Sequence, residues 1–199
     1  MSPEQIVAFA IFAAVAAGTP GPSNALLTAT GAQAGVLRGL PALLGVALGM
    51  GLLIFVVAYG LGSLIPSVAP VLTAVKWLGA AVLCWFAWQI ATADVADDGS
   101  YPVRSIGLLQ AAAFQWVNPK SWLVSASAAA TFLDRGAGRV LGQSLALALI
   151  FVVVCLVCCF PWLAGGAVVQ QYLRSRRARR LFNGIMGVLL AASVVLLVR

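Results

Sequence analysis

Lys120 is the residue whose type and position most clearly indicate chemistry. It lies well inside a segment that begins near Ile106 and stays apolar through Ala130. An ionised side chain deep in an apolar segment is costly unless it meets a partner or water. Two interpretations stay open. Lys120 meets an anionic group such as a substrate carboxylate, or it snorkels to an interface at the end of the segment.

Lys120 belongs to one of two proline-containing interruptions of apolar segments, near 18–24 and 115–121. Proline removes a backbone donor and breaks a helix, and the freed backbone groups must then face protein or a polar cavity. Paired broken helices in a duplicated membrane chain indicate the substrate site of a transporter. The candidate substrate-binding residues are therefore Pro20, Gly21, Pro22, Ser23, Asn24, Gln115, Asn118, Pro119 and Lys120.

The asparagines at the two interruptions, Asn24 and Asn118, have two compatible interpretations. A side-chain amide both donates and accepts, which suits a zwitterionic solute. Asparagine is also a preferred helix cap, so each could serve only the broken helix beside it. Helices that begin just after Pro22 and Pro119 would aim free amide groups and positive dipole ends at a cavity, which favours a carboxylate.

Residue types that support other chemistry are missing from the apolar segments. The chain has no histidine, and its acids lie at the end or in loops: Glu4, Asp94, Asp97, Asp98 and Asp134. The four cysteines (Cys84, Cys155, Cys158 and Cys159) fall inside apolar segments and are interpreted as small packing residues. The sequence thus indicates no embedded proton relay, no metal site, no nucleophile-base pair and no cofactor. We therefore do not expect this protein to be an enzyme.

The composition is that of an all-α integral membrane protein. Hydrophobic residues make up 62% of the chain and charged residues 9%, whereas soluble domains are nearer half apolar and a quarter charged. The net charge of +7 comes mainly from the arginines between Arg174 and Arg180. Because this cluster is short and lies between hydrophobic segments, we expect it to meet anionic lipid headgroups and not nucleic acid.

Six membrane-spanning helices are predicted, and the first and fourth are broken at the proline motifs. The segments are 4–29, 40–62, 69–92, 106–131, 141–165 and 182–198, with loops at 31–39, 63–70, 93–105, 134–138 and 170–180. Residues 1–92 form a first three-helix repeat, 93–105 a connecting loop, and 106–199 a second repeat. An odd number of spans per repeat makes the two repeats inverted, with Pro20 and Pro119 in equivalent positions.

The distribution of basic residues predicts the orientation. Loops after the first, third and fifth spans carry seven arginines, against three or four basic residues on the other side. The seven are Arg38, Arg104, Arg174, Arg176, Arg177, Arg179 and Arg180. The positive-inside rule then places them in the cytoplasm and both termini outside.

An ordered set of motifs resembles the LysE-type (RhtB-like) amino-acid exporter family over nearly the whole chain. In order along the chain the motifs are Pro20-Gly21-Pro22, the spaced glycines Gly35, Gly39, Gly45 and Gly49, Lys76-Trp77-Leu78-Gly79-Ala80, Asn118-Pro119-Lys120, and Asn183-Gly184 with Gly187. The glycines are interpreted as close helix contacts. The resemblance implies an exporter of small amino acids or similar solutes in the inner membrane, driven by the proton motive force. Many members carry an acid in the fifth span, and 147–160 has none.

The function that these observations favour is secondary export of amino acids or related small carboxylate-bearing solutes across the bacterial cytoplasmic membrane. The alternatives are a metal-cation exporter of related fold and a non-transporting membrane scaffold. The absent membrane acids and histidines argue against the first, and two costly helix interruptions argue against the second. The expected partners are a small-molecule substrate and membrane lipids, with no nucleic acid; a homodimer is one option for the oligomeric state.

Overall fold

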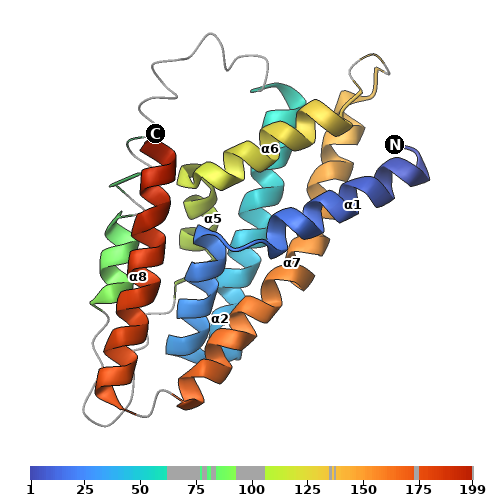
Figure 1. Ribbon diagram of the computed structural model, residues 1–199. Coiled ribbons are helices and arrows are strands. Elements are labelled where there is room, and N and C mark those ends of the chain that lie inside the picture. The colour runs from blue at the N-terminus through green and yellow to red at the C-terminus, as the bar shows by residue number, and fades with distance from the viewer. Residues whose placement is uncertain are drawn as a thin grey trace.

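The chain folds into a bundle of helices (Figure 1). A computed structural model describes residues 1–61, 77, 80–81, 84–92, 106–134, 136, 138–172 and 175–198. These residues form α1 (Pro3–Gly18), α2 (Pro22–Val56), the π-helix η1 (Val57–Leu61), α5 (Leu108–Val117), α6 (Pro119–Phe132), α7 (Val140–Tyr172) and α8 (Arg176–Val198). No strand occurs among them, which confirms the all-helical prediction. The predicted loop at 63–70, the connecting loop at 93–105 and half of the third segment lie outside the described residues.

Both predicted helix breaks are confirmed. Helix α1 ends at Gly18 and α2 begins at Pro22, while α5 ends at Val117 and α6 begins at Pro119. Proline is favoured at the first helical position because the amide it lacks would have no partner there. The two prolines that start helices are Pro22 and Pro119, and the expected equivalence of Pro20 with Pro119 in two inverted repeats stays a prediction.

Helix α2 contains a reversal where the sequence predicts a loop. The predicted loop over 31–39 is wrong, because residues on both sides of Gly35 are helical and Gly35 alone leaves the helix, with φ 77° and ψ 176°. Glycine adopts a positive φ at little cost. A straight helix of 35 residues would be about 50 Å long, more than a bilayer core of about 30 Å. Figure 1 shows the first segment of α2 (22–34) and its second segment (36–56) running in opposite directions.

Helix α7 packs along both segments of α2, and this is the most extensive helix pairing among the described elements. Small residues allow the close approach: a Cβ at Gly31 would lie 2.0 Å from the Leu163 carbonyl oxygen, and one at Gly39 would lie 2.4 Å from the Leu163 side chain. Gly45 and Gly49 meet the backbone of α5 in the same way. The interpretation as close helix contacts is thus confirmed for Gly39, Gly45 and Gly49 of the motif. It is wrong for Gly35, which makes the turn.

The close packing of α7 on α2 predicts opposite effects for two neighbouring glycines. A Cβ at Gly166 would lie 2.0 Å from the Thr28 carbonyl oxygen, whereas one at Gly165 meets no atom within 4 Å. We expect Gly166→Ala to lower the free energy of unfolding by about 1–3 kcal/mol through overpacking. Gly165→Ala should be neutral or slightly stabilising because alanine favours a helix. Thermal unfolding of the two detergent-purified variants measures the difference, and equal melting temperatures would contradict this packing.

The ends of the helices fit a membrane protein with both termini on one side. In Figure 1 both termini lie at the upper end of the bundle, whereas α7 ends and α8 begins at the lower end. Two helical stretches in the described part of the chain are long and apolar enough to span a membrane by themselves, Pro22–Gly60 and Val140–Val169. The six-span inverted arrangement stays a prediction. The expected loop at 170–180 is shorter, since α7 extends to Tyr172 and α8 begins at Arg176.

Candidate functional site

The two helix breaks lie against each other and are joined by hydrogen-bonded side chains. The Ser23 hydroxyl donates to Gln115 Oε1 over 3.0 Å, and Asn118 Nδ2 donates to Ser23 Oγ over 3.0 Å. The Ser121 hydroxyl donates to the same Gln115 oxygen over 2.9 Å. Gln115, Asn118 and Ser121 are buried. This polar cluster ties the start of α2 to both sides of the second break, so the predicted site residues of the two halves form one unit.

Asn24 and Asn118 both satisfy backbone groups that the breaks set free. Asn24 Nδ2 donates to the Ala17 and Thr19 carbonyl oxygens, over 3.1 and 2.8 Å, at the end of α1. Asn118 Oδ1 accepts from the Lys120 amide over 3.1 Å at the start of α6. The capping role considered for each asparagine is therefore present. A contact of either with substrate stays a prediction.

Lys120 reaches from the second break across to the first. Its Nζ donates to the Thr19 carbonyl oxygen over 2.5 Å, at the C-terminal end of α1 where the helix dipole is negative. The side chain passes over Gly21, where a Cβ would lie 2.9 Å from Lys120 Cδ. An ammonium group carries three donors, and no carboxylate of the described residues pairs with it. Donors thus stay free for a further acceptor at the meeting point of the breaks.

Two cavities meet at this point, and all nine predicted site residues line one or the other. A small cavity of about 30 Å³ is bounded by Ser23, Gln115 and Asn118 and by apolar side chains of α2 and α7. A large cavity of about 490 Å³ lies between the breaks and α8, and Pro20, Pro22 and Pro119 line it. Both cavities include Gly21, Asn24 and Lys120. The structure therefore brings together every residue that the sequence analysis selected.

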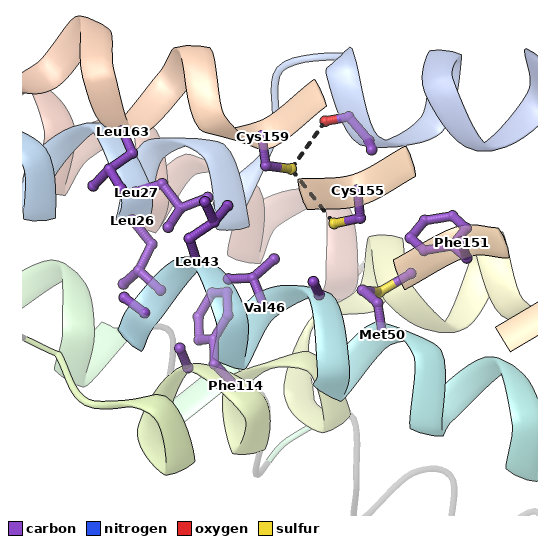
Figure 2. Close-up of a cluster of buried hydrophobic side chains, with 14 of the residues drawn as sticks. Leu26, Leu27, Leu43, Val46, Met50, Phe114, Phe151, Cys155, Cys159 and Leu163 are labelled. Carbon is purple, nitrogen blue, oxygen red and sulfur yellow. Dashed lines mark hydrogen bonds between the residues drawn. The ribbon is translucent and has the colours of Figure 1, made fainter. Parts of the chain in front are cut away.

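Sequence reasoning missed two thiols in the wall of the small cavity. Cys155 and Cys159 are buried, with their sulfur atoms 3.6 Å apart. Cys159 Sγ lies 3.6 Å from both the Ala17 carbonyl oxygen and Asn24 Oδ1, so it contacts the first break directly (Figure 2). Their four-residue spacing places both on one face of α7, which is the signal that could have separated them from Cys158. Within the described residues, no group of three His, Cys, Asp or Glu could hold a metal ion.

The contact between Gly21 and Lys120 predicts a functional effect without a folding defect. A methyl group at Gly21 would lie 2.9 Å from Lys120 Cδ and 3.2 Å from its Nζ. The flexible lysine can move away, and alanine tolerates the extended backbone at Gly21, where φ is −178°. We expect Gly21→Ala to leave the melting temperature nearly unchanged and to reduce solute transport about tenfold, because a displacement near 1 Å disturbs binding geometry strongly. Gly18→Ala, which meets no atom within 4 Å, is the control and should transport normally.

The helical fold and the polar site at paired helix breaks define a membrane transport protein. Residues 14–199 match the family described as LysE type translocator. The chain is 30% identical to a cysteine/O-acetylserine efflux protein of Salmonella typhimurium strain LT2 and 29% identical to one of Escherichia coli strain K12, each over 98% of both chains. The chain belongs to the LysE type translocator family, and it is a transporter and not an enzyme. No solved structure matches it.

Proposed function

We propose that this chain is a secondary transporter that exports amino acids or related small carboxylate-bearing solutes across the bacterial cytoplasmic membrane. The observation that carries the proposal is the position of Lys120, whose ammonium group lies at the junction of both breaks and both cavities. A charged donor forms a strong hydrogen bond with a carboxylate. The relatives are named for the efflux of cysteine and O-acetylserine, which supports amino acids as the substrate class.

The starts of α2 and α6 add to the attraction for an anion. Both helices begin at the breaks, with Pro22 and Pro119 at their first positions. The N-terminal turn of a helix carries free amide groups and a partial positive charge. Asn24 and Gln115 lie beside it, and a zwitterion that binds their amide groups would exchange with the hydrogen bonds that these groups already make. The same positive charge disfavours a metal cation, which argues against the alternative of a metal-cation exporter.

The membrane arrangement is part of the proposal. We propose two inverted three-helix repeats (1–92 and 106–199) with both termini outside the cytoplasm. The arginines at the start of α8 would then lie at the cytoplasmic surface; they include Arg177, Arg179 and Arg180. Cations at a helix N-terminus are unfavourable by themselves. Anionic lipid headgroups would offset this repulsion. A homodimer is compatible with this arrangement.

Efflux from proteoliposomes tests the proposed function. The purified protein is reconstituted in vesicles loaded with a labelled amino acid, and efflux is followed with and without an imposed proton gradient. We expect faster efflux than from protein-free vesicles, and a clear preference for the amino acid over its amide. Absence of efflux for every amino acid tried would contradict export. Equal movement of acid and amide would contradict recognition of the carboxylate.

A further inference from the structure

The small cavity cannot contain a whole amino acid. Its volume of about 30 Å³ is only about two to three times the roughly 10–15 Å³ that a cavity needs to hold one water molecule. The side chains around it are already hydrogen-bonded to one another, as the Ser23, Gln115 and Ser121 contacts show. A solute whose carboxylate reaches Lys120 must therefore place the rest of its volume on the other side of that lysine, in the large cavity.

The large cavity has an almost entirely apolar wall. Its volume of about 490 Å³ falls within the range of about 300–1,000 Å³ that ligand pockets occupy. Leu123 of α6, Trp162 of α7, and Met186 and Leu189 of α8 line it. Thr28 also borders it, but its hydroxyl donates to the Asn24 carbonyl oxygen over 2.9 Å and is already satisfied. Polar groups with spare capacity are thus concentrated at the inner end, around Lys120.

We propose that the site selects amino acids with large apolar side chains, such as those of leucine, methionine and phenylalanine. This inference rests on the proposed export function and specifies its substrate class. The carboxylate would meet Lys120, and the side chain would lie against Leu123, Trp162 and Met186. A small side chain, such as that of the cysteine named for the relatives, would leave most of this apolar wall without contact.

A lipid acyl chain is the competing occupant of the large cavity. Leu123 and Leu189 are 70% and 54% exposed, so the outer end of the cavity opens toward the surroundings of the bundle. Charge favours the amino acid, because the inner end presents the ammonium of Lys120. A hydrocarbon chain would leave the free donors of this ammonium without a partner, whereas the carboxylate of a solute complements them.

Counterflow in proteoliposomes tests the selectivity. Vesicles are loaded with unlabelled alanine, leucine or phenylalanine, and uptake of the same labelled amino acid is measured over a concentration series. We expect half-saturation at least about tenfold lower for leucine and phenylalanine than for alanine, since even one methylene in an apolar pocket can discriminate by about tenfold or more. Half-saturation that is equal for the three, or lowest for alanine, would overturn the inference and leave export itself intact. Absence of any counterflow would overturn the proposed function and this inference with it.

A matched pair of α8 variants locates the selectivity. Met186→Trp puts a larger ring into the cavity wall, whereas Ile185→Trp adds the same ring to the next residue, which is 48% exposed and does not line the cavity. We expect Met186→Trp to weaken leucine and phenylalanine transport at least tenfold more than alanine transport. Ile185→Trp should change none of them. If both variants reduce the transport of all three amino acids equally, the cavity is a lipid site and the inference fails. If Met186→Trp does not fold, the comparison of alanine, leucine and phenylalanine counterflow by the wild type remains decisive.

Discussion

Replacing Lys120 by glutamine should nearly abolish transport of carboxylate-bearing solutes while leaving the protein folded. Glutamine can still donate a hydrogen bond toward the Thr19 carbonyl oxygen that Lys120 contacts, so the joint between the breaks is kept. What is lost is the charge. A hydrogen bond to a charged group contributes about 1.5–3 kcal/mol, which corresponds to a roughly tenfold to hundredfold loss of affinity for a carboxylate at 1.4 kcal/mol per factor of ten.

The loss should appear as a change of selectivity as well as of rate. In proteoliposomes the wild type should prefer an amino acid over its amide, and Lys120→Gln should lose that preference. Lys120→Glu should be inactive because it reverses the charge beside the positive starts of α2 and α6. Lys120→Arg should be intermediate, since the guanidinium keeps the charge but is planar and larger. It would also crowd Gly21, which leaves little space beside the lysine.

Two controls separate the proposed role of Lys120 from a structural one. Lys76→Gln changes the other lysine of the chain, which the sequence analysis places at the start of the third segment, and it should retain most of the activity. The melting temperature of Lys120→Gln should lie close to that of the wild type. A variant that keeps full preference for the acid would show that Lys120 only anchors α6 to the end of α1.

The sequence was sufficient to predict the helix breaks because proline acts locally. Pro22 and Pro119 each start a helix, as their fixed φ and missing amide require. It was also sufficient to predict that the nine site residues share one region, because freed backbone groups in a membrane must meet polar partners. These inferences depend on a few adjacent residues, and no knowledge of the tertiary structure is needed to make them.

The missed features depend on tertiary packing. Residues on both sides of Gly35 form good helix, so composition alone does not show that one glycine replaces the predicted loop. The early start of α8 reflects arginine's high helix propensity, which a hydropathy criterion overlooks. Cysteine packs well anywhere in an apolar helix. Which of the four cysteines faces the site is decided by the position of α7 against α1 and α2, and only the structure shows it.

Replacing Gln115 by methionine should weaken the connection between the two breaks, destabilise the protein and inactivate it. Gln115 is fully buried, and its Oε1 accepts from the Ser23 and Ser121 hydroxyls while its Nε2 donates to the Ala111 carbonyl oxygen over 3.1 Å. Methionine has a similar length and fits a helix, but it offers only a weak acceptor. Hydrogen bonds between membrane helices contribute about 0.6 kcal/mol on average and up to about 1.7 kcal/mol. Since the two bonds to other helices, from Ser23 and Ser121, are lost, we expect a destabilisation of about 1–3 kcal/mol.

A double-mutant cycle with Ser23→Ala measures the connection itself. Ser23→Ala alone removes the donor to Gln115 and the acceptor of Asn118. If the two side chains act through their mutual bond, adding Ser23→Ala to the Gln115→Met variant should lower the free energy of unfolding by less than adding it to the wild type. This difference, the coupling energy, should be about 0.5 kcal/mol or more.

The matched control is Gln110→Met, which makes the same change on the exposed first turn of α5, where Gln110 accepts from the Gly107 amide. Thermal unfolding and efflux should show Gln110→Met close to wild type. If the losses of unfolding free energy for Ser23→Ala and Gln115→Met are strictly additive, the two breaks move independently. If Gln115→Met keeps full transport, the polar cluster between the breaks is not required to form the site.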